Sequence, residues 1–364
     1  MTDPRLTVSE LGEGGLIRRI ARILGAPPRG DLGIGDDAAV VSLRGSHALL
    51  TTDVLVEGTH FHRRWFRPEE VGHKALAANI SDAAAMGGEP THALVSLVLP
   101  PATSVEAVER IYRGMRRLAR REGVAVIGGN LARGERISVT VFLLGRFRSG
   151  KALLRSGAHA GDRVFVSGRP GLAYLGFRLL DAVLPVARRT AAGGPRDPWL
   201  EAPAGEPAWR RELRAGSPEA SAALRRFLVP EPRVPLARAL RRLHPTSLID
   251  VSDGLSIDLG HLAETGVRVE LDPERLPIAP GFRTLAHALG EHSVLACLRG
   301  GEDYELLFTL PPAAAARAAR EGILGGVRVT EIGRIARGPA GVFVPGSGGW
   351  TPLPPLGFRH FSRP

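Results

Sequence analysis

Strand patterns and helix patterns alternate along both halves of this chain, and the alternation restricts the fold more than any other feature. Short apolar runs with β-branched residues end at turn-forming residues, and longer segments between them repeat apolar residues every three to four positions. This order is typical of sheets covered by helices, so we predict an α/β or α+β architecture. A chain of 364 residues is long enough for two domains with separate cores.

The first half carries the clearer pattern. We expect strands at 47–56, 93–99, 124–127 and 137–144, and helices at 68–86 and 104–122. Pro68 stands near the start of the first helix, Ser104 is suited to cap the second, and Gly123 is suited to end it. These elements predict an N-terminal domain over residues 1–149.

The second half predicts a C-terminal domain over residues 150–364. Its strands are expected at 163–167 and near 247–251, 267–271, 305–310 and 327–335, with helices at 172–183, 221–227 and 236–243. Residues 185–218 are rich in Pro, Gly, Ala and Arg and lack apolar periodicity. We therefore expect a mobile insertion at 185–218.

The chain is strongly basic, with a net charge of +11. Of the 48 basic residues only Lys74 and Lys151 are lysines, and the arginines are spread along the chain, which fits a GC-rich codon bias better than a nucleic-acid-binding stripe.

The single cysteine, Cys297, excludes a disulfide framework and a cysteine-based zinc site. No apolar run reaches the ~18–20 residues of a membrane span, and the first residues contain no apolar signal segment. We expect a cytoplasmic protein without nucleic-acid or membrane partners.

Five short motifs place acidic or amide side chains beside Gly, Ser or Thr at expected strand ends. They are Gly35-Asp36-Asp37, Thr51-Thr52-Asp53, Asn79-Ile80-Ser81-Asp82, Gly128-Gly129-Asn130 and Asp250-Val251-Ser252-Asp253-Gly254. Carboxylate, hydroxyl and amide oxygens are the ligands that Mg²⁺ prefers. One such motif alone is more often a turn or a helix cap. Five in one chain favour a site for Mg²⁺ and phosphate.

Glycines stand where the backbone can approach a phosphate closely, at 33–35, 128–129 and 300–301. The chain lacks the Gly-x-x-x-x-Gly-Lys-Ser/Thr motif of P-loop proteins. It also lacks the His-Arg-Asp and Asp-Phe-Gly elements of protein kinases. An enzyme with this sequence that uses ATP therefore needs another fold.

Taken together, these motifs resemble the thiamine-monophosphate kinase family, within the aminoimidazole ribonucleotide synthetase-like superfamily. The similar segments are 33–40, 52–61, 74–87, 155–158, 250–255, 300–306 and 356–361. The resemblance runs from about residue 9 to 361 and is interrupted by the insertion. It implies a two-domain fold in which the N-terminal sheet pairs in a homodimer and a C-terminal α/β domain follows.

The resemblance also implies an activity: the γ-phosphoryl group of ATP passes to thiamine monophosphate, giving thiamine diphosphate and ADP, with several Mg²⁺ ions. The implied metal ligands are Asp36, Asp37, Thr51, Thr52, Asp53, Asp82, Asn130, Asp250 and Asp253, where Asp36 is either a ligand or structural. The implied ATP-binding residues are Tyr112, Gly129, Asn130, Arg155 and Ser252. The implied substrate-binding residues are His60, Glu302 and Phe358.

These roles agree with the chemistry of phosphoryl transfer. The acceptor is an ionised phosphate, so the reaction needs charge neutralisation and positioning, and no general base is expected. Arg155 can donate two parallel hydrogen bonds to a phosphate, and Phe358 offers an aromatic face to a cationic thiazolium ring. The family usually has Asp at the position of Asn130, where Asn keeps an oxygen but loses a charge. The alternatives are a sister enzyme with another small acceptor and a non-catalytic ATP-binding paralogue.

Overall fold

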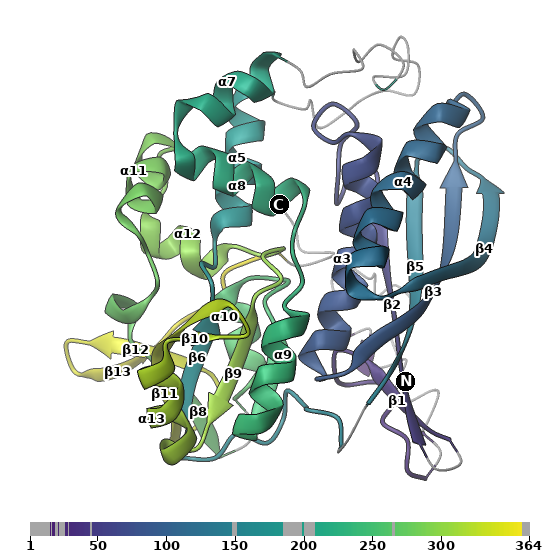
Figure 1. The fold of residues 1–364 in the computed structure, drawn as a ribbon. Coiled ribbons are helices and arrows are strands. Elements are labelled where there is room, and N and C mark those ends of the chain that lie inside the picture. The colour runs from purple at the N-terminus through teal and green to yellow at the C-terminus, as the bar shows by residue number, and fades with distance from the viewer. Residues whose placement is uncertain are drawn as a thin grey trace, which may run out of the picture.

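The computed structural model describes residues 29–43, 46–147, 151–184, 208–263 and 266–358, with residues 15, 17, 18, 21, 26, 27 and 199. Helices and strands alternate in these parts, and the strands form two sheets, one from each half of the sequence (Figure 1). The predicted mixed α/β architecture is confirmed. None of the helices in these ranges combines the length and the apolarity needed to cross a membrane.

The N-terminal sheet has five strands in the order β1-β2-β5-β3-β4. Their bounds are β1 (Ala39–Leu43), β2 (Ser46–Val56), β3 (Glu89–Leu99), β4 (Ala125–Arg133) and β5 (Ser138–Arg146). Neighbours are antiparallel, except that β3 and β4 run parallel. In β5, Val139, Val141 and Leu143 are buried, whereas Phe142 between them is 39% exposed. The sheet therefore has a buried inner face and an exposed outer face.

Helices α3 (Pro68–Ala85) and α4 (Val105–Glu122) cover the inner face (Figure 1). Two glycines allow the helices to touch, because a Cβ on Gly72 would lie 1.9 Å from the carbonyl oxygen of Ile111, and one on Gly114 as close to that of Glu69. The predicted caps of α4 are confirmed: Ser104 accepts a hydrogen bond from the backbone N–H of Ala107, and Gly123 ends the helix at φ 74°.

The C-terminal sheet has the strand order β13-β12-β8-β11-β6-β9-β7, and β10 pairs with β11. Its strands are β6 (Arg163–Ser167), β7 (Ser247–Asp250), β8 (Val267–Leu271), β9 (Leu306–Leu310), β10 (Ile323–Leu324), β11 (Val327–Arg337), β12 (Val342–Gly346) and β13 (Gly349–Pro352). The helices of this half are α5 (Leu172–Val183), α7 (Ala208–Gly216), α8 (Pro218–Leu228), α9 (Val234–Leu240), α10 (Leu255–His261), α11 (Pro280–Ala288), α12 (Ser293–Arg299) and α13 (Pro312–Glu321). The boundary expected near residue 150 falls between β5 and β6, and the two-domain division stays a prediction.

Helix α3 belongs to the N-terminal half but also contacts β7, α8 and α9 of the C-terminal half. As a result, 15 of its 18 residues are buried. This double burial explains why the helix is rich in alanine and has no polar face.

The expectation of an irregular insertion over 185–218 is wrong for its final part, where residues 208–216 form α7 and Pro218 begins α8. Arg210 on α7 is 3% exposed, and its guanidinium group donates to the Glu70 carboxylate at 2.6 Å and to the Trp65 carbonyl oxygen. Trp199 is buried too, and its Nε1 donates to the Phe66 carbonyl oxygen at 2.8 Å. These anchors are single polar contacts, which a search for apolar periodicity does not detect. The rest of 185–207 lies outside the described residues.

Candidate active site

The acidic motifs meet where the C-terminal part of α3 lies against β2 and β7. Asp82 of α3 accepts a hydrogen bond from the Thr51 hydroxyl group of β2 at 2.7 Å. The neighbouring Ser81 hydroxyl group donates to Oδ2 of Asp250 at 2.5 Å, at the end of β7. Two successive residues of one helix therefore join carboxylates from both halves of the chain.

Burial and mutual repulsion raise the pKa values of these carboxyl groups. Burial is the main cause for Asp250 and raises its pKa to about 7, with smaller contributions from the charges of Asp53 and Asp253 and opposition from the Ser81 hydroxyl group. Burial also raises the pKa of Asp82 well above its usual value, and the charges of Asp53 and Asp250 add to it. Acidic groups this close are unfavourable without a cation nearby.

Asp37 extends this acidic cluster, which we define as Asp37, Asp53, Asp82, Asp250 and Asp253. Burial and then the charge of Asp250 raise the pKa of Asp37, whereas the Arg155 guanidinium group lowers it. Arg155 therefore lies beside the cluster. Its backbone N–H donates to the Asp36 carboxylate at 3.3 Å, and so does the backbone N–H of Asp37, at 2.9 Å. Asp36 thus fixes the loop that carries Asp37.

The acidic cluster offers the donor atoms that Mg²⁺ prefers, namely carboxylate oxygens with hydroxyl groups beside them. Oδ2 of Asp37 is buried and has no hydrogen-bond partner in the described structure. Within the described ranges, no three His, Cys, Asp or Glu side chains already enclose a metal position. The residues thus fit Mg²⁺ bound partly by a few carboxylates and partly by phosphate oxygens and water, and they do not form a complete protein cage.

Two of the three implied substrate-binding residues, Glu302 and Phe358, are joined by backbone hydrogen bonds to the Asp250–Gly254 motif, and the third, His60, follows β2. The backbone N–H of Glu302 donates to the Ser252 carbonyl oxygen at 2.7 Å, and that of Phe358 donates to the Asp253 carbonyl oxygen at 3.0 Å. Nδ1 of His60 accepts from the Val56 backbone N–H at 2.9 Å, so the neutral ring carries its proton on Nε2. The Phe358 side chain is 49% exposed.

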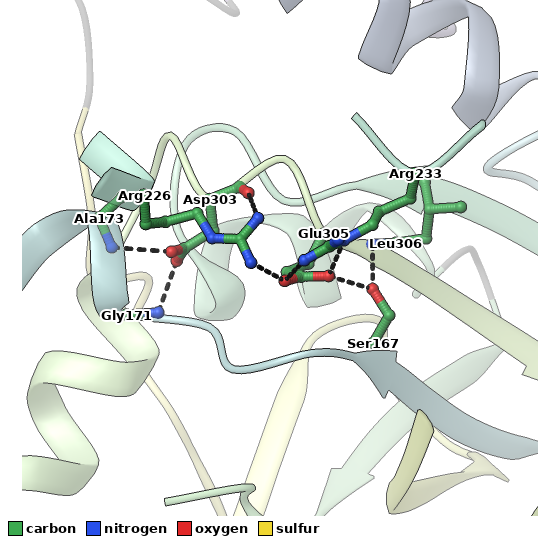
Figure 2. Close-up of polar contacts among 8 residues, drawn as sticks. All are labelled: Ser167, Gly171, Ala173, Arg226, Arg233, Asp303, Glu305 and Leu306. Atoms are coloured by element: carbon green, nitrogen blue, oxygen red, sulfur yellow. Dashed lines mark hydrogen bonds and ion pairs between the residues drawn. The ribbon is translucent and has the colours of Figure 1, made fainter. Parts of the chain in front are cut away.

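A buried polar network holds the loop that carries Glu302 (Figure 2). Asp303 accepts from the backbone N–H groups of Gly171 and Ala173 at the start of α5, at 2.5 and 2.9 Å. Glu305 accepts from the Ser167 hydroxyl group at 2.5 Å and pairs with Arg233 at 2.5 Å and Arg226 at 3.0 Å.

The two carboxyl groups of this network differ in pKa. Burial raises the pKa of Asp303 to about 7. Burial acts on Glu305 in the same direction, but the Arg226 and Arg233 guanidinium groups outweigh it and hold the pKa of Glu305 at about 2. Asp303 and Glu305 thus anchor the loop in the core. The backbone takes a φ of 61° at Glu302, just before Asp303, and of 50° at Tyr304, between the two anchors.

Sequence reasoning missed Tyr304, Ser81 and the anchoring roles of Asp303 and Glu305. Tyr304 is 6% exposed, and burial, Glu302 and Asp53 all raise its pKa, so it faces the acidic cluster. A carboxylate in a glycine-rich segment is by default a solvated loop charge, and only its fully buried position reveals another role. Serine next to a predicted ligand could have suggested the hydrogen bond from Ser81.

The structure does not bring Gly129 and Asn130 together with the acidic cluster within one chain. They lie on β4, and the sheet order inserts β5 and β3 between β4 and the Asp53 strand, a span of about 14 Å at ~4.8 Å per strand. The pairing of Val54 with Thr140, Thr140 with Ser96 and Ser96 with Asn130 assigns Asn130 to the outer face.

Thr52 is also directed away from the acidic cluster. It pairs with Phe142 on the exposed outer face, and its hydroxyl group donates to the Val141 carbonyl oxygen at 3.0 Å. Thr51, the preceding residue, is the one that reaches Asp82. Alternation along β2 therefore separates the two threonines of the motif onto opposite faces.

Tyr112 lines a separate open pocket of about 890 Å³ between α4 and the ends of β3 and β4. Leu131 and Val108 supply apolar surface there. Arg116 and Arg133 supply positive charge, whereas Arg113 pairs with Glu109, which also lines the pocket, at 2.5 Å. Such a lining suits a flat ring attached to an anionic chain.

Comparison with known proteins gives consistent results. The family model "AIR synthase related protein, N-terminal domain" matches residues 35–147. A thiamine-monophosphate kinase of Aquifex aeolicus is 36% identical, and the match covers 98% of this chain and 100% of the relative. The thiamine-monophosphate kinase of Mycobacterium tuberculosis strain H37Rv is 32% identical, and the match covers 98% of this chain and 94% of the relative. A solved structure of AaThiL complexed with AMPPCP and TMP superimposes with a TM-score of 0.80 at 34% identity, covering 98% of this chain and 100% of that one.

Proposed function

The chain belongs to the thiamine-monophosphate kinase family, and we propose that it transfers the γ-phosphoryl group of ATP to thiamine monophosphate, giving thiamine diphosphate and ADP. The observation that carries this proposal is the acidic cluster with Arg155 at its edge. Phosphoryl transfer between two anionic substrates depends on neutralising and positioning their phosphates, and this arrangement supplies both.

Mg²⁺ ions held by the acidic cluster would neutralise the charge of the phosphates when bound. Asp37, Asp53, Asp82, Asp250 and Asp253 are the proposed carboxylate ligands, and Thr51 is a further oxygen ligand. Asp36 is engaged with two backbone N–H groups, which supports the structural alternative for this residue. Ser81 orients Asp250 by its hydrogen bond.

The chain's own residues then divide between the two substrates. Arg155 would hold ATP phosphate oxygens through paired N–H groups, and Ser252, which hydrogen-bonds to Asp250, would add a hydroxyl group. Glu302, His60 and Phe358 would hold thiamine monophosphate, with the exposed Phe358 ring available to the thiazolium cation. The relative described as AaThiL in complex with AMPPCP and TMP supports both substrates.

The pocket at Tyr112 is the proposed site for the adenine ring of ATP. Tyr112 provides an aromatic surface, and Arg116 and Arg133 attract the polyanionic tail. Gly129 and Asn130 lie on β4, which also lines this pocket, but they are remote from the acidic cluster of the same chain. A contact between Asn130 and phosphates held at an acidic cluster would therefore need a second subunit.

A homodimer formed through the outer face of the N-terminal sheet is therefore part of the proposal. Val54, Leu94 and Phe142 are each about 40% exposed on this face, at 41%, 42% and 39%. Large neighbouring apolar side chains are typical of an interface. Sedimentation of the wild type and a Phe142→Lys variant tests this, and a monomeric wild type would contradict it.

The direct test of function is chromatographic detection of thiamine diphosphate from thiamine monophosphate, ATP and Mg²⁺. We expect product from the wild type and at least ~10²-fold slower formation by Asp82→Asn, which removes one carboxylate from the cluster. ATP binding without product would favour the non-catalytic paralogue. ADP formed only with another acceptor would favour the sister enzyme.

A further inference from the structure

We propose that Lys74 is a positioning residue for the phosphoryl acceptor, because its ammonium group joins Glu302 to the segment that carries His60. This inference rests on the proposed function and extends it to a residue outside the predicted site. Lys74 lies on α3 and is fully buried, at 0% exposure.

The contacts of the ammonium group connect two segments that are far apart in the sequence. Nζ of Lys74 lies 2.7 Å from Oε1 of Glu302. It also donates a hydrogen bond to the carbonyl oxygen of His60 at 3.3 Å. A single cation therefore fixes the distance between two groups that we assign to the acceptor.

Two aromatic rings determine where this cation lies. Nζ is 4.4 Å from the centre of the Phe227 ring and 5.1 Å from that of Phe66. The two rings contact each other edge to face, 5.3 Å apart. Their negative faces replace part of the hydration that the buried ammonium loses, so the side chain is held in one place by packing and by charge.

Glu302 needs such support because of its backbone. Its φ of 61° is unusual for a residue with a side chain, and its own backbone N–H is fixed to the Ser252 carbonyl oxygen. Its side chain is 29% exposed, so one carboxylate oxygen pairs with Lys74 while the group still reaches the surface of the site. The carboxylate of Glu302 is held by this contact and suits a cationic or hydrogen-bond-donating part of the acceptor.

The residue type agrees with this role. Lys74 is one of two lysines among 48 basic residues, so lysine stands here against a strong preference for arginine. Nζ lies to one side of both rings, which contact each other with centres 5.3 Å apart. The compact ammonium group of lysine suits this position, and the larger planar guanidinium group of arginine differs from it in shape and in hydrogen-bond geometry.

The test is steady-state kinetics of Lys74→Met, with Lys151→Met as the matched control because Lys151 is the other lysine and is exposed. Methionine has a similar length and keeps the apolar contact with both rings. We expect the KM for thiamine monophosphate to rise at least ~10-fold in Lys74→Met, while the KM for ATP stays within about twofold and the melting temperature within a few degrees. Lys151→Met should match the wild type.

A double variant decides whether Lys74 acts through Glu302. The KM of Lys74→Met combined with Glu302→Gln should be no higher than that of the worse single variant, because both changes break the same pair. Additive effects of the two substitutions on the KM for thiamine monophosphate would overturn the role. An unchanged KM in Lys74→Met would also overturn it, and so would equal losses for both substrates together with a lower melting temperature.

If the wild type forms no thiamine diphosphate, the proposed function is wrong, but the role of Lys74 in binding can still be tested. Calorimetric binding of thiamine monophosphate to the same variants then decides the role of Lys74. Weaker binding by Lys74→Met supports the positioning role, and an unchanged or undetectable affinity across the wild type and all variants overturns it.

Discussion

Replacing Asp250 by asparagine should stabilise the metal-free protein while it removes the activity. The carboxyl group is 2% exposed, and its surroundings raise its pKa from 3.8 to about 7. At pH 8 the charged form therefore costs about 4 kcal/mol, since a tenfold change in proton affinity is about 1.4 kcal/mol. Asparagine avoids this cost but weakens the hydrogen bond from Ser81, which removes about 2 kcal/mol of the gain. The net increase of about 2 kcal/mol corresponds to about 2–3 °C in a chain of this length.

The sign of the pH dependence makes the test specific. Because the pKa is higher in the folded state, the destabilisation begins as the pH rises through the unfolded value and is complete above the folded value. Scanning calorimetry in EDTA should therefore show a larger advantage for Asp250→Asn at pH 8 than at pH 5. Mg²⁺ should raise the melting temperature of the wild type more than that of the variant. A variant that melts below the wild type at pH 8 in EDTA would refute the electrostatic reasoning.

Three further predictions follow from the contacts described above. Arg210→Met should lower the free energy of unfolding by about 3 kcal/mol because it leaves Glu70 without its buried partner; an unchanged urea midpoint would contradict this. Phe358→Ala should raise the KM for thiamine monophosphate about tenfold, from a lost cation–π contact of ~1–2 kcal/mol, and an equal rise for ATP would instead make Phe358 a general structural residue. If the proposed homodimer brings Asn130 to the acidic cluster of the partner, Asn130→Asp should lower the Mg²⁺ concentration that gives half the maximal rate, since hard cations prefer anionic oxygen; an unchanged or higher requirement in a magnesium titration would contradict that placement.

The order of elements and most of the acidic cluster could be predicted from the sequence, because both depend on local patterns. Alternation predicted β5, and the caps at Ser104 and Gly123 predicted both ends of α4. Asp82 and Asp250 were identified because short acidic motifs are visible without any tertiary information. The strand-end positions expected for all five motifs are wrong for Asp82, which lies on α3, and for the motifs of Asp53 and Asn130, which lie inside β2 and β4.

What could not be predicted depends on contacts between distant segments. Asn130 follows two glycines, as a metal ligand of this kind of motif would. Only the strand order and pairing show that β4 is remote from Asp53 and that Asn130 lies on the outer face. Trp199 and Arg210 lie in a segment of disordered composition, and their anchors on Phe66 and Glu70 are more than 130 residues away in the sequence. A periodic pattern contains no information on such single long-range contacts.

The double burial of α3 has a consequence for how the molecule folds. Neither half can complete its core alone, because the N-terminal sheet needs α3 on one side and β7, α8 and α9 pack on the other. If the C-terminal half unfolded first, it would expose the buried residues of α3 that pack against it, which include alanines and the charged Lys74. The chain should therefore unfold in one cooperative step despite its two sheets. Its evolution is constrained in the same way, since an exchange of either half with a relative must preserve both surfaces of a single helix.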